Sequence, residues 1–72
     1  MEKIKRYIIS RDGIGFFKSI LESYEDIGIF SVLDGRRGFI EISYSQFFEH
    51  DLQMIIADMA HFGIEFNEVK DV

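Results

Sequence analysis

The two histidines are the residues best suited to metal binding or acid–base chemistry, and their spacing separates them. His50 and His61 are eleven residues apart in a segment whose apolar pattern predicts a helix. At the rise of an α-helix they would share a face but lie about 16 Å apart along its axis, so one ion cannot contact both. Asp58 and His61 have the i, i+3 spacing of a partial metal site, for which a surface ion pair is the simpler interpretation. We therefore predict no metal site.

Catalytic chemistry also lacks a recognisable set of residues. Cysteine is absent, so the chain has neither a thiolate nucleophile nor a disulfide. The sequence contains no nucleophile elbow, no phosphate-binding loop and no evident Ser-His-Asp grouping. We predict a protein that is not an enzyme, has no catalytic residue and needs no cofactor.

Charge is unevenly distributed along the 72 residues. Residues 1–38 hold seven Lys and Arg against six Asp and Glu, a sum of +1, whereas residues 39–72 hold one Lys against seven acidic residues, a sum of −6. The total of −5 disfavours nonspecific binding to nucleic acid or to an anionic membrane. No run approaches the ~18 apolar residues of a membrane span, and the N-terminus lacks the features of a signal peptide. We expect a cytoplasmic protein.

The first half of the chain predicts a strand, a turn and a helix. Residues 3–10 place Ile4, Tyr7, Ile8 and Ile9 between charges, which indicates a strand that is buried on at least one face. Residues 11–15 have the composition of a turn that could cap a helix. Residues 14–26 follow, with apolar residues at helical spacing on one face.

The second half predicts a hairpin, a second helix and a last strand. Residues 27–33 are almost all apolar, and the Asp34-Gly35 pair indicates a tight hairpin into the alternating residues 39–44. The second helix begins somewhere in residues 45–51, with Ser43 and Ser45 as rival caps, and ends at Gly63. Residues 64–69 supply the last strand.

This order of elements predicts one α+β domain over residues 1–72. Strand, helix, strand, strand, helix, strand with right-handed connections is the ferredoxin-like βαββαβ fold, a four-stranded antiparallel sheet with two helices on one face. The first and third strands then lie in the middle of the sheet, and the second and fourth lie at its edges.

The predicted second strand is an edge without the usual protection. It contains no charge, proline or evident bulge, although natural edges are commonly protected by such features. We interpret it as a homodimer interface, edge to edge or sheet to sheet, formed by Ile27, Ile29, Phe30, Val32 and Leu33. The alternative is that the first helix and the chain termini cover this strand.

The segment from Asp12-Gly13-Ile14-Gly15 to Ile20-Leu21, followed by Ile27-Gly28-Ile29, resembles the first half of an ACT domain, a regulatory module that often binds amino acids. The resemblance implies a ligand held between two subunits, with Asp12, Gly13 and Gly15 of one subunit and Ile29 and Phe30 of its neighbour forming the site. Ile14 stands where that family usually has proline. An alternative role for Gly15 is to let the helix and strand pack closely.

The stretch Ile20-Leu21-Glu22-Ser23-Tyr24-Glu25 also resembles a family of short uncharacterised bacterial proteins, which implies a stand-alone domain of no known activity. Residues 37–44 partly match the third-strand motif of RNA-recognition motifs. Glu41 stands at a base-stacking position of that motif, where its carboxylate would repel phosphate, so RNA binding is the less favoured hypothesis. Two hypotheses lead: a dimeric module that senses a small ligand such as an amino acid, or an interaction and assembly domain without a metabolite.

Overall fold

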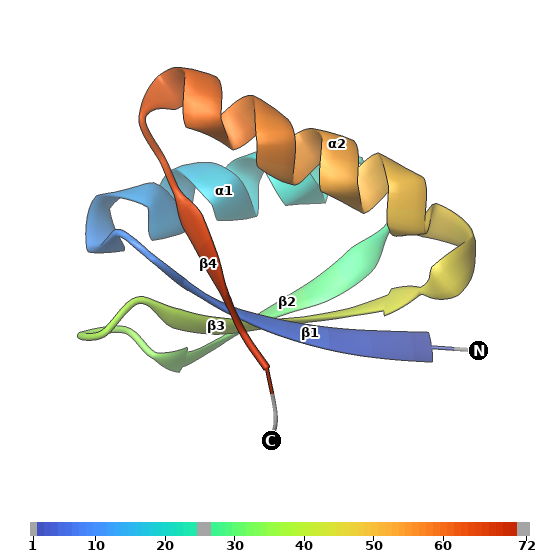
Figure 1. Ribbon diagram of the computed structural model, residues 1–72, viewed down its shortest axis with the longest axis horizontal. Coiled ribbons are helices and arrows are strands. Elements are labelled where there is room, and N and C mark those ends of the chain that lie inside the picture. Colours follow the sequence, from blue (N-terminus) through green and yellow to red (C-terminus); the bar gives the residue numbers. More distant parts are fainter. Residues whose placement is uncertain (1, 25–26, 71–72) are drawn as a thin grey trace.

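The computed structural model describes residues 2–24 and 27–70, and its element order confirms the predicted ferredoxin-like fold (Figure 1). In chain order the elements are β1 (Glu2–Ile9), α1 (Arg11–Ser23), β2 (Gly28–Asp34), β3 (Phe39–Ser45), the 3-10 turn η1 (Gln46–Phe48), α2 (Glu49–Met59), the 3-10 turn η2 (Ala60–Phe62) and β4 (Phe66–Val69).

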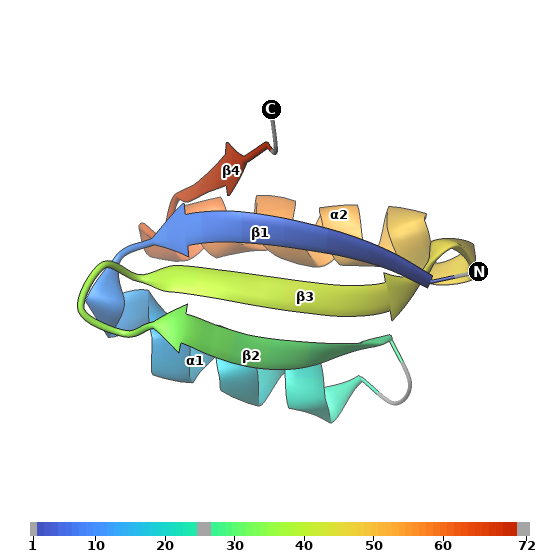
Figure 2. The same ribbon diagram turned by 90° about the horizontal axis from the view of Figure 1, so that it is seen from below.

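The four strands form one antiparallel sheet in the order β2-β3-β1-β4. The middle strands are therefore β1 and β3, as predicted, and the edges are β2 and β4. Both helices lie against the same face of the sheet, and Figure 2 looks onto the opposite face, with the helices behind. We call this second side the open face.

The core lies between the sheet and the helices because the strands alternate. Tyr7 and Ile9 of β1 are buried, and every second residue of β3, from Ile40 to Tyr44, is buried beside them. Each helix buries part of its apolar stripe, Phe17 and Leu21 in α1 and Leu52, Ile55 and Met59 in α2, whereas the predicted stripe residues Phe16, Tyr24 and Phe62 are exposed. The buried core residues are Tyr7, Ile9, Phe17, Leu21, Ile27, Ile40, Ile42, Tyr44, Leu52, Ile55, Met59 and Ile64.

Helix α1 begins earlier than predicted, at Arg11, so the prediction that residues 11–15 form a turn is wrong. Ser10 has extended backbone angles, and its carbonyl accepts a hydrogen bond from Gly13 N–H at 2.9 Å. Gly13 is buried. A Cβ there would lie 2.7 Å from Ile64 Cγ2, so the close packing of Ile64 explains why this position is glycine. The predicted helix end, at residue 26, lies outside the described residues.

The hairpin between β2 and β3 is longer than the predicted tight turn. The register shifts between Val32 and Asp34, and four residues separate the two strands. Gly38 has a φ of 71°, and its carbonyl accepts a hydrogen bond from Ile9 N–H at 2.9 Å. A Cβ at Gly38 would collide with the Ile9 carbonyl, so this turn requires glycine.

The second helical segment confirms one of the two candidate caps. The Ser45 hydroxyl accepts a hydrogen bond from Phe47 N–H at 3.2 Å, which starts η1, and α2 continues from Glu49. Gly63 closes η2 with a φ of 79°, the left-handed conformation predicted for a helix end. No helix in the described part of the chain is long and apolar enough to cross a membrane.

Candidate interaction surface

The predicted interface residues divide between the surface and the core. Ile29 is 68% exposed, and Val32 and Leu33 are each about half exposed on β2. Phe30 is half-buried, with its ring 5.5 Å from that of Phe17. Ile27 is only 5% exposed and precedes the first residue of β2. Within one protomer Ile27 therefore belongs to the core, and not to the exposed surface on which the sequence predicted an interface.

The open face carries two further exposed apolar residues that sequence reasoning did not assign to an interface. Ile4 is 57% exposed and Ile8 is 38% exposed. They alternate along β1 with the buried Tyr7 and Ile9, so they point away from the helices. The two-residue period was visible in the sequence, but it could not show which face the helices would leave uncovered.

The strand register arranges the open face into rows across the sheet. Paired residues of neighbouring strands share a face, so the register places Ile4, Ser43 and Ile29 in one row. A second row contains Arg6, Glu41 and Ser31. A third contains Ile8 and Phe39 in the middle, with Asn67 of β4 and Asp34 of β2 at its ends. A polar row therefore lies between two rows that carry isoleucine or phenylalanine.

The polar row is held by an ion pair between the two middle strands. Arg6 Nε donates a hydrogen bond to Glu41 Oε2 at 3.0 Å, and both side chains are about one quarter to one third exposed. Beside this pair, a hollow of about 160 Å³ is lined by Ile8, Arg37, Phe39 and Val69. The face thus carries exposed apolar residues on either side of an ion pair, together with polar residues such as Ser31, Ser43 and Asn67.

The residues predicted to bind a ligand lie in two separate places. Asp12 and Gly13 line a hollow of about 480 Å³ at the start of α1, together with Ser10, Phe16, Phe62, Gly63 and Ile64. Ile29 lines a different hollow, of about 330 Å³, at the start of β2, together with Glu2, Ile27, Gly28, Ser43, Tyr44 and Ser45. One protomer therefore does not bring the two predicted halves together.

The two glycines of the predicted ligand turn have different surroundings. Gly13 is buried against Ile64, whereas a Cβ at Gly15 would meet no atom within 4 Å. The alternative prediction, that Gly15 allows close packing of helix and strand, is therefore wrong; the close approach is at Gly13, to Ile64 in the segment before β4. Phe16 and Phe62 stand edge to face beside the hollow, with ring centroids 5.2 Å apart.

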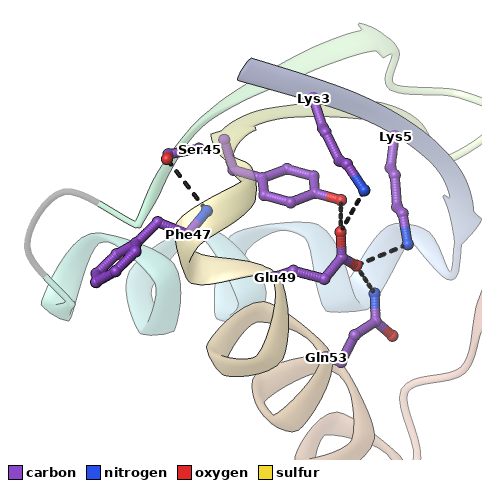
Figure 3. A network of polar contacts seen from close by, with 7 residues as sticks. Lys3, Lys5, Ser45, Phe47, Glu49 and Gln53 are labelled. Atoms are coloured by element: carbon purple, nitrogen blue, oxygen red, sulfur yellow. Dashed lines mark hydrogen bonds and ion pairs between the residues drawn. The ribbon is translucent and has the colours of Figure 1, made fainter. Parts of the chain in front are cut away.

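A polar cluster centred on Glu49 joins β1, β3 and α2 (Figure 3). Glu49 Oε1 accepts hydrogen bonds from Tyr44 Oη at 2.7 Å and from Lys3 Nζ at 3.5 Å. Glu49 Oε2 accepts from Lys5 Nζ at 3.0 Å and from Gln53 Nε2 at 3.3 Å. The sequence prediction missed this cluster, because it depends on register between a strand and a helix 44 positions apart.

The cluster is paired too completely to act as an acid or base near neutral pH. The hydrogen bonds from Tyr44 and then Lys5 lower the pKa of Glu49 to about 2. Burial, followed by the hydrogen bond to Glu49, raises the pKa of Tyr44 to about 12. Neither group exchanges a proton near pH 7. Among the described residues, no three His, Asp or Glu side chains gather closely enough to hold a metal ion.

The fold and this surface define the class: a small α+β domain of ferredoxin-like architecture with exposed apolar residues on the sheet face that the helices leave uncovered. The chain belongs to the family described as Domain of unknown function (DUF4911), whose model matches residues 7–62. This agrees with the resemblance to a family of uncharacterised proteins. Comparison with curated proteins and with solved structures gives no significant match.

Proposed function

We propose that this domain is a non-catalytic association module that works as a homodimer through its open face and the adjoining β2 edge. The observation that carries the proposal is the exposure of Ile29 and Ile4, at 68% and 57%, on the sheet face opposite both helices. Exposed apolar groups that gather on one surface commonly mark an association site.

The edge strand and the polar groups support the same proposal. The β2 edge carries exposed apolar side chains, including Ile29, and its lysine- and proline-free first part can pair. Its end does have a register irregularity and the charged Asp34, so the prediction of an edge without a bulge is wrong there. In the part of the chain that the structure describes, no buried polar side-chain atom lacks a hydrogen-bond partner. Buried polar groups left unpaired for chemistry are one mark of an active site, so this feature favours association over catalysis.

Sedimentation velocity tests the proposal directly. We expect the wild-type chain to sediment as a dimer at tens of micromolar, and the Ile4→Ser variant to shift toward monomer. The matched control is Met54→Ser on α2, because Met54 is exposed to 56% on a helix that lies against the other face of the sheet. A wild-type chain that stays monomeric at several hundred micromolar would contradict the proposal.

A second candidate is an ACT-like module whose dimer senses a small ligand, and one observation favours it. The hollow at the start of α1 combines the Asp12 carboxylate with exposed aromatic rings, a setting that suits the amino group and side chain of an amino acid. Thermal unfolding with each amino acid tests it: a ligand at 100 times its Kd stabilises by about 2.7 kcal/mol. Loss of that shift in Asp12→Ala would support the site, and no shift with any amino acid would exclude this candidate.

A further inference from the structure

We infer that two copies pack open face to open face about a two-fold axis that runs parallel to the strands, between β1 and β3. This inference rests on the proposed function and specifies its geometry. Because the strand order is β2-β3-β1-β4, this axis places β1 of one copy over β3 of the other. Residue contacts are then reciprocal, as a two-fold interface requires, and the two sheets stack about 10 Å apart.

The ion pair selects this axis over the other in-plane choice. Arg6 and Glu41 occupy paired positions on β1 and β3, so an axis between these strands places Arg6 over Glu41 of the partner subunit. An axis across the strands through the same row would place Arg6 over Arg6 of the partner subunit. The proposed axis therefore surrounds each charge with opposite charge, which a buried ion pair needs if it is to be favourable.

The row of Ile4, Ser43 and Ile29 is complementary to itself about the same axis. Ile4 lies over the partner's Ser43, whose small side chain leaves room for it. Because β2 lies one strand beyond β3, Ile29 falls beside the partner's Ile4. The isoleucines of the two copies thus alternate along the row. Such interdigitation covers Ile29 and Ile4, the most exposed large apolar residues of the face.

The remaining apolar row follows the same rule. Ile8 and Phe39 are paired on β1 and β3, so Ile8 lies over the partner's Phe39 and the contact occurs twice. Apolar contacts thus form on both sides of the ionic row: Ile8 packs on the partner's Phe39, and Ile4 packs beside the partner's Ile29. Burial of these isoleucines removes apolar surface from water, which favours association.

Charge on the open face also favours a second copy as the occupant. Its charged side chains in the described residues include Arg6 and Arg37 against Glu2 and Glu41, and the register adds Asp34, which is paired with Phe39. Two positive and three negative charges nearly balance, although the whole chain carries −5. Two copies therefore meet there with little excess of like charge, whereas a polyanion would find no net positive charge to bind.

A mixed-variant experiment isolates the contact between subunits. Arg6→Glu places two acidic groups on the ionic row of one chain, and Glu41→Arg places two basic groups on that of another. Either variant alone is expected to be monomeric at concentrations where the wild type is dimeric. Mixed in equal amounts, they are expected to form a heterodimer, detected by native mass spectrometry. Mixing changes no contact within either chain, so rescue reports only the contact across the interface.

The outcomes separate this inference from the proposed function. If the wild type is dimeric but both variants dimerise as the wild type does, the dimer forms elsewhere and the face-to-face geometry is wrong. Folded single variants that fail to associate when mixed would also overturn it. A wild type that is monomeric overturns the proposed function as well. Circular dichroism of each variant checks that it is folded.

A distance measurement on the dimer keeps the inference testable if those variants unfold. The chain contains no cysteine, so Glu68→Cys on the β4 edge carries a single spin label per subunit. With strands about 4.8 Å apart and sheets about 10 Å apart, face-to-face packing places the backbones of the two labelled residues roughly 18 Å apart. Pairing of two β2 edges would place these backbones about 34 Å apart. A main distance in the longer range would overturn the inference.

Discussion

At the residue scale, Glu49 is the polar group that links β1, β3 and α2. Its carboxylate accepts hydrogen bonds from β1, from β3 and from the next turn of α2. Its position in the first turn of α2 also suits a negative charge, because the N-terminus of a helix carries partial positive charge. Glu49 therefore fixes the start of α2 above the two middle strands.

Glu49→Gln is expected to lower the free energy of unfolding by about 1–2 kcal/mol at about pH 7, because charged hydrogen bonds are lost and partial exposure limits their strength. The folded-state pKa of Glu49 is about 2, below its ordinary value of 4.5. Its contribution is thus complete above about pH 4.5 and disappears as pH falls toward 2. Urea unfolding of both proteins at several pH values measures this.

The matched control for Glu49 is Glu65→Gln, an exposed carboxylate between η2 and β4. We expect this control to change stability by less than about 0.5 kcal/mol at any of these pH values. A stability difference between wild type and Glu49→Gln that stays constant from pH 7 to pH 2.5 would show that the charge of Glu49 is not what stabilises the cluster.

At the element scale, the sequence predicted the type and order of all six main elements because the hydrophobic periodicity and the turn and cap signals were strong. The start of α1 was wrong because Gly13 in isolation indicates a turn, while its real cause is the approach of Ile64, about fifty residues later. The role of Ile27 was wrong for a similar reason: an apolar run does not show where the strand begins. Both errors concern contacts between distant parts of the chain.

The candidate surface was predicted only in part for the same physical reason. The β2 half was visible from the sequence, because Ile29, Val32 and Leu33 form an apolar run at a predicted edge. To predict the β1 half, one must know which face of the sheet the helices cover. Alternation identifies two sides of a strand, but the placement of both helices on one side decides that Ile4 and Ile8 are exposed.

At the scale of the whole molecule, size connects stability to association. A chain of 72 residues has a core that is only just sufficient, and it lacks the disulfides that small domains often use. Burying the open face against a second copy adds apolar contact that one protomer cannot provide. The folded state of the proposed dimer then becomes more stable as the protein concentration rises.

The midpoint of thermal unfolding, Tm, should therefore depend on protein concentration. A 100-fold increase in concentration stabilises a dimer by about 2.7 kcal/mol, or half of that per protomer, which for a domain of this size raises Tm by roughly 5–10 °C. Scanning calorimetry from micromolar to several hundred micromolar measures the shift. Met54→Ser should retain the dependence, and Arg6→Glu should lose it because like charges would meet on the ionic row. A wild-type Tm that is constant over this range would show that one copy of the chain is the folding unit, with its open face exposed to water.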